Sequence, residues 1–264
     1  MLSATTRPLF TTPTTHFATT RHPLLRRISL PTTTRTTFTT RATMSTTTTT
    51  IEHIVLFNVK PTADTTQLSA MLNGLNSLST LPQVLHLSAG KLHRYRSSSL
   101  SFTHILHSRY RSKQDLADYS AHPDHLSVVR TSVLPICDDL MAVDWVAENL
   151  EGPVGVKPGS AIRVQLIKLK EGVEEEKKGE VVEMIGRLKG KIKGIEQSSI
   201  GENFSPARAK GFEICSIGVF GGVADLDSHD ADSDPFNEKH KVRDSVDSLV
   251  IVDYVVPSKQ SASL

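Results

Sequence analysis

Histidine and tyrosine side chains of the N-terminal half are the residues of this chain best suited to acid–base chemistry. His53 and His104 lie early in two predicted strands, and Tyr119 and His125 lie in a predicted helical segment. A histidine titrates near neutral pH and can accept a proton, while a tyrosine hydroxyl can orient or polarise a carbonyl group. We expect the two strands to be parallel neighbours at the centre of a sheet, so that both histidines meet in one pocket.

The same residues also fit a structural role, which we favour from the sequence. The segment His122-Pro123-Asp124-His125 interrupts a helix, because the residue before a proline resists the α-helical conformation. Its imidazoles can cap helix ends or bind backbone carbonyl groups. Lining of a ligand pocket and catalysis remain the two alternative interpretations.

An aspartate-rich stretch in the C-terminal half has the composition of a calcium loop but not its spacing. It contains Asp225, Asp227, Asp230, Asp232 and Asp234. Counted from Asp230, position 6 is Pro235 and position 12 is Lys241, where a calcium loop needs glycine and glutamate. We predict a solvated loop that leads into a helix. The two cysteines, Cys137 and Cys215, are too few for a disulfide framework, and we expect buried thiols.

The elements that would position these residues occur twice. The strand-like segment 53–60 has a counterpart at 163–170, and Val143-Asp144-Trp145-Val146 matches Val252-Asp253-Tyr254-Val255. The two matches have offsets of 110 and 109 residues, so they support one duplication better than either match alone.

Hydrophobic periodicity and turn signals give each copy the order β-α-β-β-α-β. In the first copy we predict strands at 51–60, 84–92, 102–110 and 140–146, and helices at 64–80 and from Ser112, which has the S-x-x-D spacing of a helix cap. In the second copy we predict strands at 161–169, 195–201, 212–220 and 249–255, and helices at 174–193 and 236–247.

The predicted fold class is therefore α+β, with two tandem ferredoxin-like domains behind a disordered N-terminal segment. The open face of each sheet is apolar and must be covered, so we expect the two sheets to pack against each other as a barrel within the chain. The predicted domains are 51–150 and 161–257, with a Gly- and Pro-rich linker at 151–160 and a tail at 258–264.

Residues 1–50 are rich in threonine, contain six arginines and have no acid, which is typical of a disordered organellar transit segment. Met44 offers a second start, and the chain ends in Ala262-Ser263-Leu264, a relative of the Ser-Lys-Leu peroxisomal signal. We predict a peroxisomal protein, with the chloroplast as the alternative location.

Charge and hydropathy argue against two classes of partner. The formal net charge is +2, and without the six N-terminal arginines the rest of the chain carries about −4. Because it lacks a basic stripe, we expect no nucleic-acid binding. No run of about 18 apolar residues occurs, so we expect no membrane span.

Four segments together resemble the stress-response A/B barrel family, a dimeric α/β-barrel type, in its plant tandem two-domain form. They are HIVLF at 53–57, TH at 103–104, DYSAHPDH at 118–125 and VDW at 143–145. One member of this family closes a polyketide ring without a cofactor, using a tyrosine and histidines at positions matching Tyr119, His125, His53 and His104. The second copy departs from this pattern, with Arg163, Glu213 and approximately Asn237 in place of the histidines.

The resemblance implies two functions between which the sequence does not decide. The first is a non-enzymatic, self-assembling stress-response protein that binds a small apolar ligand. The alternative is a cofactor-independent, polyketide cyclase-like enzyme with its Tyr/His pocket in the first domain. A homodimer is left open. The resemblance also implies a candidate Mg²⁺ site at the backbone carbonyls of Gly74, Ser77 and Thr80, and no required cofactor.

Overall fold

Two β-α-β-β-α-β units follow each other in the computed structural model, which describes residues 49–97, 99–189, 192–232 and 244–258. Both units lie within one compact part of the chain, residues 45–264. The predicted targeting segment with Met44 falls on residues 1–50, of which only the last two are described. The predicted signal Ala262-Ser263-Leu264 lies outside the described residues. The peroxisomal and chloroplast locations therefore stay predictions.

The first unit closely follows its sequence pattern. Its elements are β1 (Thr49–Val59), α1 (Thr65–Ser77), β2 (Val84–Arg96), β3 (His104–Tyr110), α2 (Lys113–Ala121), α3 (Pro123–Val128) and β4 (Cys137–Glu148). Asp64 and Gln67 form a capping box at the start of α1, and the Ser112 hydroxyl accepts a hydrogen bond from the Asp115 N–H at the start of α2. Pro123 separates α2 from α3, as the sequence predicts.

The second unit contains a helix, α5, in a segment that the sequence predicts as a loop. Its elements are β5 (Ala161–Leu169), α4 (Glu175–Lys189), β6 (Ile195–Glu202), the 3₁₀ turn η3 (Pro206–Arg208), β7 (Ile214–Phe220), α5 (Val223–Asp232) and β8 (Val246–Val255). The helix predicted at 236–247 falls largely outside the described residues, and its last two positions belong to β8. The first aspartates of the acid-rich stretch lie on α5 instead of in a loop, because Leu226 is fully buried and anchors this segment as a helix.

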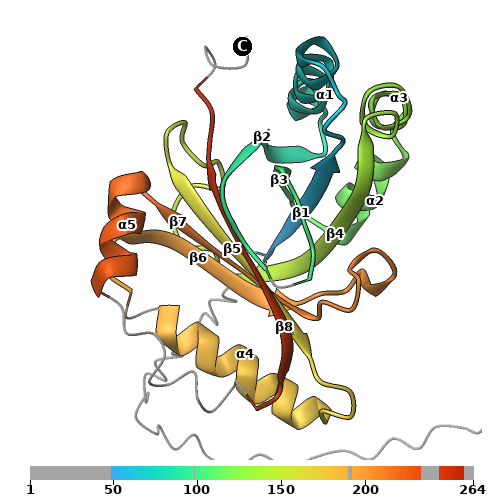
Figure 1. Ribbon diagram of the computed structural model, residues 1–264. Coiled ribbons are helices and arrows are strands. Elements are labelled where there is room, and N and C mark those ends of the chain that lie inside the picture. The colour runs from blue at the N-terminus through green and yellow to red at the C-terminus, as the bar shows by residue number, and fades with distance from the viewer. Residues whose placement is uncertain (1–48, 98, 190–191, 233–243, 259–264) are drawn as a thin grey trace, which may run out of the picture. The chain divides into compact units, whose positions relative to one another are not determined.

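The strands form one antiparallel sheet with the order β4-β1-β3-β2-β8-β5-β7-β6 (Figure 1). The two units join where β2 pairs with β8, from Leu92 opposite Tyr254 to Arg96 opposite Ile251. At the other end of the sheet, β4 approaches β6, where the Phe204 N–H donates to the Asp144 carbonyl at 2.9 Å. The expected intrachain barrel is thus confirmed, and its two half-sheets are continuous.

One hydrophobic core fills the space between the inner faces of both units. The inner positions of β1, β4, β5 and β8 alternate with outer ones along each strand, as in any pleated sheet. The core contains Ile54, Leu56, Val143 and Trp145 from the first unit and Ile162, Val164, Ile217, Val252 and Tyr254 from the second. Each half therefore covers the apolar sheet face of the other.

An aromatic side chain lies over a glycine at each junction between the units. A Cβ atom added to Gly201 of β6 would lie 2.9 Å from the Trp145 side chain and 3.0 Å from the Val146 carbonyl oxygen. At the other junction, a Cβ atom on Gly90 of β2 would lie 3.0 Å from the Tyr254 ring. Only glycine allows the last strand of one unit to approach the second strand of the other this closely.

Replacing Gly201 by alanine is expected to lower the free energy of unfolding by about 1–3 kcal/mol, because the new methyl group overpacks the junction against backbone and a buried indole. Urea unfolding followed by circular dichroism measures the change. Gly155→Ala is the control, since no atom of the described residues lies within 4 Å of the place that its methyl group would take. Equal stability of the two variants would contradict this account of the junction.

Candidate functional site

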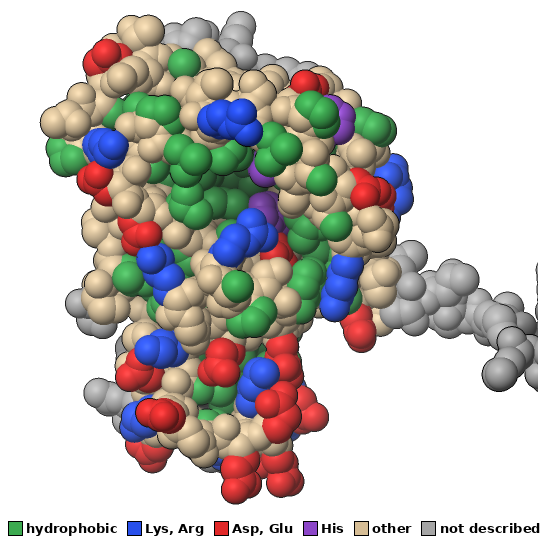
Figure 2. Space-filling model, turned by 90° about the vertical axis from the view of Figure 1, so that its right-hand side faces the viewer, with side chains coloured by type: hydrophobic (Ala, Val, Ile, Leu, Met, Phe, Trp, Pro, Cys, Tyr) green, Lys and Arg blue, Asp and Glu red, His purple; other side chains and the backbone are tan. Residues whose placement is uncertain are grey.

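The outer face of β1 and β4 is less covered than the rest of the first half-sheet. Helices α1 and α2 pack over β2 and β3, and Val55, Leu140 and Val146 on the outer face of β1 and β4 remain partly exposed. The space-filling view shows a hollow on this side of the molecule, with hydrophobic side chains around it and histidine side chains within it (Figure 2).

His53 and Asp144 form a buried imidazole–carboxylate pair on this outer face. They are direct cross-strand partners of β1 and β4, and His53 is 4% exposed while Asp144 is fully buried. The His53 Nδ1 atom is hydrogen-bonded to Asp144 Oδ1. Burial by itself raises the pKa of Asp144, but His53, Ser205 and Arg208 together hold that pKa below its ordinary value. When Nδ1–H donates to this carboxylate, Nε2 carries the lone pair and can accept a proton.

A row of aromatic rings leads from His53 to α3. The His53 and Tyr110 ring centroids lie 6.2 Å apart, those of Tyr110 and Tyr119 5.1 Å, and those of Tyr119 and His125 4.7 Å. Tyr119 is 1% exposed, and burial raises its pKa, so its hydroxyl stays protonated. The structure thus brings together three of the four residues that the resemblance singles out.

His125 is only half-buried, and its hydrogen bond fixes its tautomer. Its Nδ1 atom lies 3.0 Å from the Ser120 carbonyl oxygen, so Nδ1–H donates and Nε2 is left as an acceptor. Burial lowers the pKa of His125, which keeps the ring neutral at physiological pH. The interruption of the helix at Pro123 is what turns His125 back towards Tyr119 and the end of α2.

His104 lies apart from the other three residues, and the expectation that it meets His53 is wrong. Strands β1 and β3 are antiparallel, so His53 faces Ser108 while His104 faces Phe57, four residues further along. Four residues of strand correspond to about 13 Å. His104 bonds to the Thr103 hydroxyl instead, and burial lowers its pKa to about 4.

The second half supplies one wall of the site. The segment after β6 crosses over β4, where the Asn203 side-chain oxygen accepts hydrogen bonds from the Asp144 and Ser205 N–H groups, both at 3.0 Å. Arg208, in η3, then lies with Nη2 3.5 Å from Asp144 Oδ2. Nothing in the sequence indicates this contribution, because Arg208 and Asp144 are far apart in the chain and belong to different copies.

The equivalent position of the second half is sealed by an ion pair. Arg163 replaces His53 as predicted, and its Nε atom donates to Asp253, the counterpart of Asp144, at 2.7 Å. The strand register makes Ile214 the counterpart of His104, so the assignment of Glu213 to that position is wrong by one residue. Asn237, matched to His125, lies outside the described residues.

A separate polar cluster is buried inside the barrel, on the inner face of β1, β2 and β3. Glu52 is fully buried and accepts hydrogen bonds from His107 Nε2 at 2.7 Å and from Arg109 Nε at 3.1 Å. Burial opposes its charge, yet Arg109 and His107 hold the pKa of Glu52 at about 2. Arg109 also binds the Val154 carbonyl and Gln197, so the cluster ties the linker and the second half to the first.

His86 lies beside this cluster as a neutral imidazole. Its ring centroid is 5.1 Å from that of His107, and its Nδ1 atom accepts a hydrogen bond from the Val156 N–H at 3.4 Å. Burial, reinforced by His107 and Arg109, lowers the pKa of His86 to about 3. Sequence reasoning missed this cluster, since its members lie singly in apolar strands.

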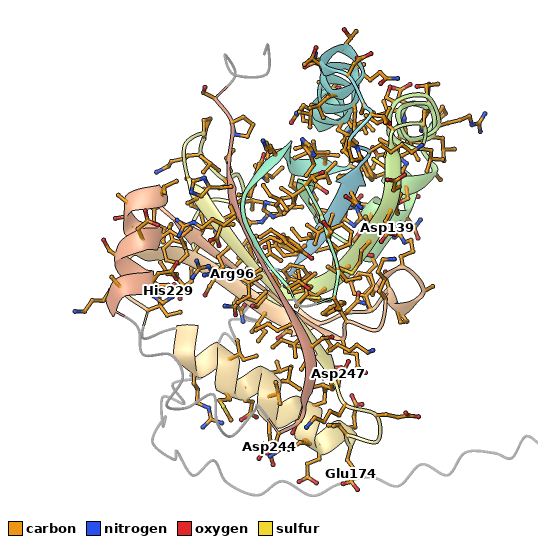
Figure 3. The ribbon with its side chains drawn as sticks, in the orientation of Figure 1. Arg96, Asp139, Glu174, His229, Asp244 and Asp247 are labelled. Carbon is orange, nitrogen blue, oxygen red and sulfur yellow. The ribbon has the colours of Figure 1, made fainter. Side chains whose placement is uncertain are left out.

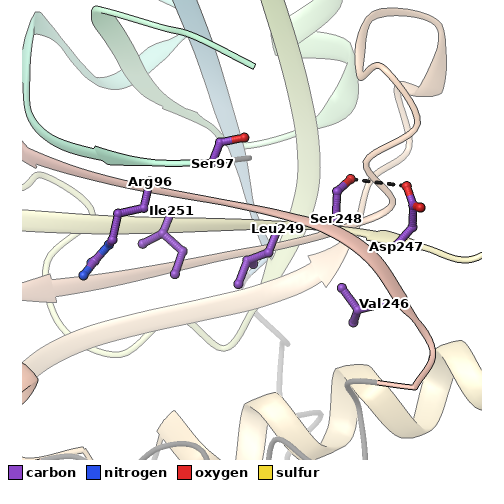
Figure 4. A pocket seen from close by; sticks show the side chains of 7 residues that line it. All are labelled: Arg96, Ser97, Val246, Asp247, Ser248, Leu249 and Ile251. Atoms are coloured by element: carbon purple, nitrogen blue, oxygen red, sulfur yellow. Dashed lines mark hydrogen bonds between the residues drawn. The ribbon is translucent and has the colours of Figure 1, made fainter. Parts of the chain in front are cut away.

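Other candidate sites carry less chemistry. A surface groove of about 400 Å³ lies along the start of β8, but its two charged residues, Arg96 and Asp247, already form ion pairs (Figure 4).

Among the described residues, no group of three or more His, Cys, Asp or Glu side chains is placed to hold a metal ion. In the same part of the chain, no helix is long and apolar enough to cross a membrane.

The carbonyls proposed to bind Mg²⁺ lie at the end of α1. The Gly74 carbonyl accepts a hydrogen bond from the Ser77 hydroxyl at 2.7 Å, and the Ser77 carbonyl accepts one from Thr80 at 2.9 Å. Both carbonyl oxygens therefore already act as hydrogen-bond acceptors, and the Mg²⁺ site stays a prediction that no step below uses.

Comparison with known proteins identifies the sequence pattern. A sequence model of the stress responsive A/B barrel domain matches residues 51–147 and again 162–256. A stress-response A/B barrel domain-containing protein from Arabidopsis thaliana is 49% identical over 267 residues, covering 100% of both chains. A second Arabidopsis thaliana protein of the same description is 44% identical over 210 residues, which cover 79% of this chain and 97% of that protein.

A solved structure from Fusobacterium nucleatum, described as a candidate monooxygenase, has the same overall arrangement. It aligns with a TM-score of 0.58 at 14% identity and covers 79% of this chain and 93% of its own. At this identity the match shows a common fold alone.

The neutral state of His86 makes stability depend on pH. Its folded pKa of about 3 lies below its ordinary value of 6.5, so protons bind preferentially to the unfolded chain as the pH falls below 6.5. This group is expected to cost about 3 kcal/mol of stability between pH 7 and pH 4. The variant His86→Gln introduces the residue found at the equivalent position of the second half, Gln197. Between pH 7 and pH 4 its free energy of unfolding, measured with urea, should fall by about 3 kcal/mol less than that of the wild type.

The exposed His93 provides the control, since His93→Gln should keep the pH dependence of the wild-type protein. Glu52 contributes mainly below pH 4.5, because its pKa is lowered from 4.5 to about 2, so it adds little at pH 4. Parallel stability curves for His86→Gln and the wild type would rule out a buried neutral imidazole at this position.

Proposed function

The chain belongs to the stress-responsive A/B barrel family, and we propose that it binds a small carbonyl compound in its first half and transfers a proton with His53. The observation that carries this proposal is the buried His53–Asp144 pair on the outer face of β1 and β4. Such a pair orients one imidazole nitrogen towards the carboxylate and leaves the other available as a base. A purely structural core would be stabilised as well by apolar side chains of the same size.

The proposed reaction begins when the ligand places a carbon next to its carbonyl group over His53. The Nε2 atom takes a proton from that carbon, the C–H electron pair forms an enolate, and the imidazole becomes imidazolium. Asp144 stabilises this positive charge, because a buried carboxylate interacts strongly with a neighbouring cation. Return of the proton to carbon restores the starting state. Attack of the enolate on a second carbonyl of the same molecule would instead form a C–C bond and close a ring, and the imidazolium would give its proton to the alkoxide that results.

Tyr119 and His125 have different roles in this proposal. Tyr119 is packed between Tyr110 and His125 and is 1% exposed, so it acts as a positioning residue that supports the rings around it. His125 is half-buried with Nε2 as an acceptor, and it can receive a hydrogen bond from a ligand hydroxyl. His104, at the other end of the strands, has no part in the site.

This proposal reverses the order of the two hypotheses drawn from the sequence. The sequence favoured a non-enzymatic binding protein, since the histidines alone fit helix capping and packing. His53 lies within a strand, however, and its partner is a buried carboxylate from another strand. Binding of a small apolar ligand remains part of the proposal, because Val55, Leu140 and Val146 are partly exposed apolar side chains on the same face as His53.

Deuterium exchange into the methyl group of acetophenone in D₂O, followed by proton NMR, tests the proton transfer. The full-length protein should accelerate exchange over buffer, and His53→Asn should reduce the acceleration about 100-fold or more. Asparagine keeps a donor for Asp144, so the fold should survive, which thermal unfolding would check.

His93→Asn is the matched control, because His93 is an exposed histidine of the same half. Its exchange rate should equal that of the wild-type protein. The proposal is overturned if the wild-type protein and His53→Asn exchange acetophenone at the same rate.

A further inference from the structure

In the second half, the position equivalent to the proposed site contains arginines that bind protein carboxylates. There, Arg163 stands in place of His53, and Arg94 and Arg96 reach across from β2 of the first half. Carboxylates of α5 lie on these arginines. Arg163 Nη2 donates to Asp230 at 2.8 Å, and Arg94 pairs with Asp227. Figure 3 shows Arg96 and His229 on the α5 side of the sheet.

The three arginines are matched by three aspartates, namely Asp227, Asp230 and the fully buried Asp253. Two of these carboxylates come from the helix that covers the site. The second half therefore fills its own site with protein carboxylates, which pair with every arginine of this cluster.

The site of the first half also has an arginine beside its buried aspartate, Arg208 from the second half, but it lacks the carboxylates from the covering helix. The strand register places Tyr110 and Phe220 at equivalent positions, and α2 and α5 follow them at the same spacing. The ring pairs Tyr110–Tyr119 and Phe220–His229 confirm this alignment. At an offset of 110 residues, Ser120 then replaces Asp230 and Ala117 replaces Asp227.

Because these two carboxylates are replaced, Arg208 can still bind a further carboxylate. Its side chain is 51% exposed, and its contact with Asp144 Oδ2 at 3.5 Å is longer than a normal hydrogen bond. Asp144 is already bound by His53 through its other oxygen. A guanidinium group presents a planar fork of donors that matches a carboxylate.

The position of Arg208 is fixed by the surrounding segment. Asn203 holds the start of that segment to the Asp144 backbone, and its Nδ2 donates to the Phe212 carbonyl at 3.1 Å. Immediately after Arg208, Ala209 is fully buried in the barrel core. The guanidinium is thus presented beside the His53–Asp144 pair with its backbone anchored on both sides.

We propose that the ligand of the first half carries a carboxylate, which Arg208 binds at the place that the α5 aspartates occupy in the second half. This inference rests on the proposed function, because the carboxylate positions the carbonyl group of the same molecule over His53. A negative charge near the imidazole also stabilises the imidazolium that forms on proton transfer. The substrate class is therefore a small, largely apolar keto acid.

Two probes of nearly equal shape test the proposal. 4-Acetylbenzoate and 4-acetylbenzamide carry the same acetyl group and differ in charge. Titration of the full-length protein, followed by NMR or calorimetry, should give about 10-fold tighter binding of the carboxylate, as expected for one charge-assisted bidentate contact. Arg208→Gln should remove this preference and leave the affinity for the amide unchanged.

A second variant reproduces the arrangement of the second half. Ser120→Asp places a carboxylate where Asp230 lies on α5, and it should abolish the preference for 4-acetylbenzoate by occupying Arg208. Arg130→Gln, at an exposed arginine after α3, is the matched control and should keep the preference. Equal affinities of the wild-type protein for the two probes, or a preference that survives in Arg208→Gln, would overturn the carboxylate site.

The outcome is separable from that of the proton transfer. A preference for 4-acetylbenzoate that depends on Arg208, without any exchange that depends on His53, would support the carboxylate site and overturn the proposed reaction. Deuterium exchange of acetophenone that depends on His53, without a preference for 4-acetylbenzoate, would support the proposed reaction and overturn the carboxylate site.

Discussion

The arrangement of the whole site depends on how Asp144 is held by both halves of the chain. Its N–H group donates to the Asn203 side chain, its carbonyl accepts from the Phe204 N–H, and its carboxylate binds His53. The first two contacts close the barrel between β4 and β6, and the third orients the imidazole. A single residue therefore links the closure of the fold to the chemistry of the outer face. Any movement between the halves would change the geometry of the imidazole–carboxylate pair.

Duplication within one chain has allowed the two equivalent positions to diverge. In a symmetric pair of identical subunits, each site would have the same residues and the same wall from its partner. Here the first half keeps a histidine beside its buried aspartate, whereas the second half has Arg163 and the covering carboxylate of Asp230. The sealed position binds α5 through the partly buried ion pair of Arg163 with Asp230, whereas the other position has no carboxylate of α2 in the matching place. The fusion thus allows the stabilising role of one position to be separated from the proposed binding role of the other.

Most of the fold was predictable from the sequence, because strand periodicity, the proline in the interrupted helix and two repeated anchors are local signals. The failures have physical reasons. Helix α5 was predicted as a loop, since the segment has glycines and aspartates that are typical of loops, and Leu226 buries it only in the tertiary structure. The relation of His53 to His104 was wrong because the direction of neighbouring strands was misjudged. Asp144 was visible as a repeat anchor, but its partner Arg208 comes from the other copy and leaves no local signal.

The buried polar cluster of the first half suggests how the two copies avoid pairing in a wrong register. The inner positions of Glu52, His107 and Arg109 are occupied in the second half by Ile162, Ile217 and Val219, which belong to the apolar core. Burying these charges is costly unless every partner is in place, so the cluster adds little net stability compared with apolar residues. Its partners, however, include Gln197 and the Val154 carbonyl, which lie beyond the first half. A shifted packing of β4 against β6 would leave Arg109 without these partners at a cost of several kcal/mol. The cluster therefore favours the one register in which Asn203 and Arg208 reach Asp144, and so it supports the site on the opposite face of the sheet.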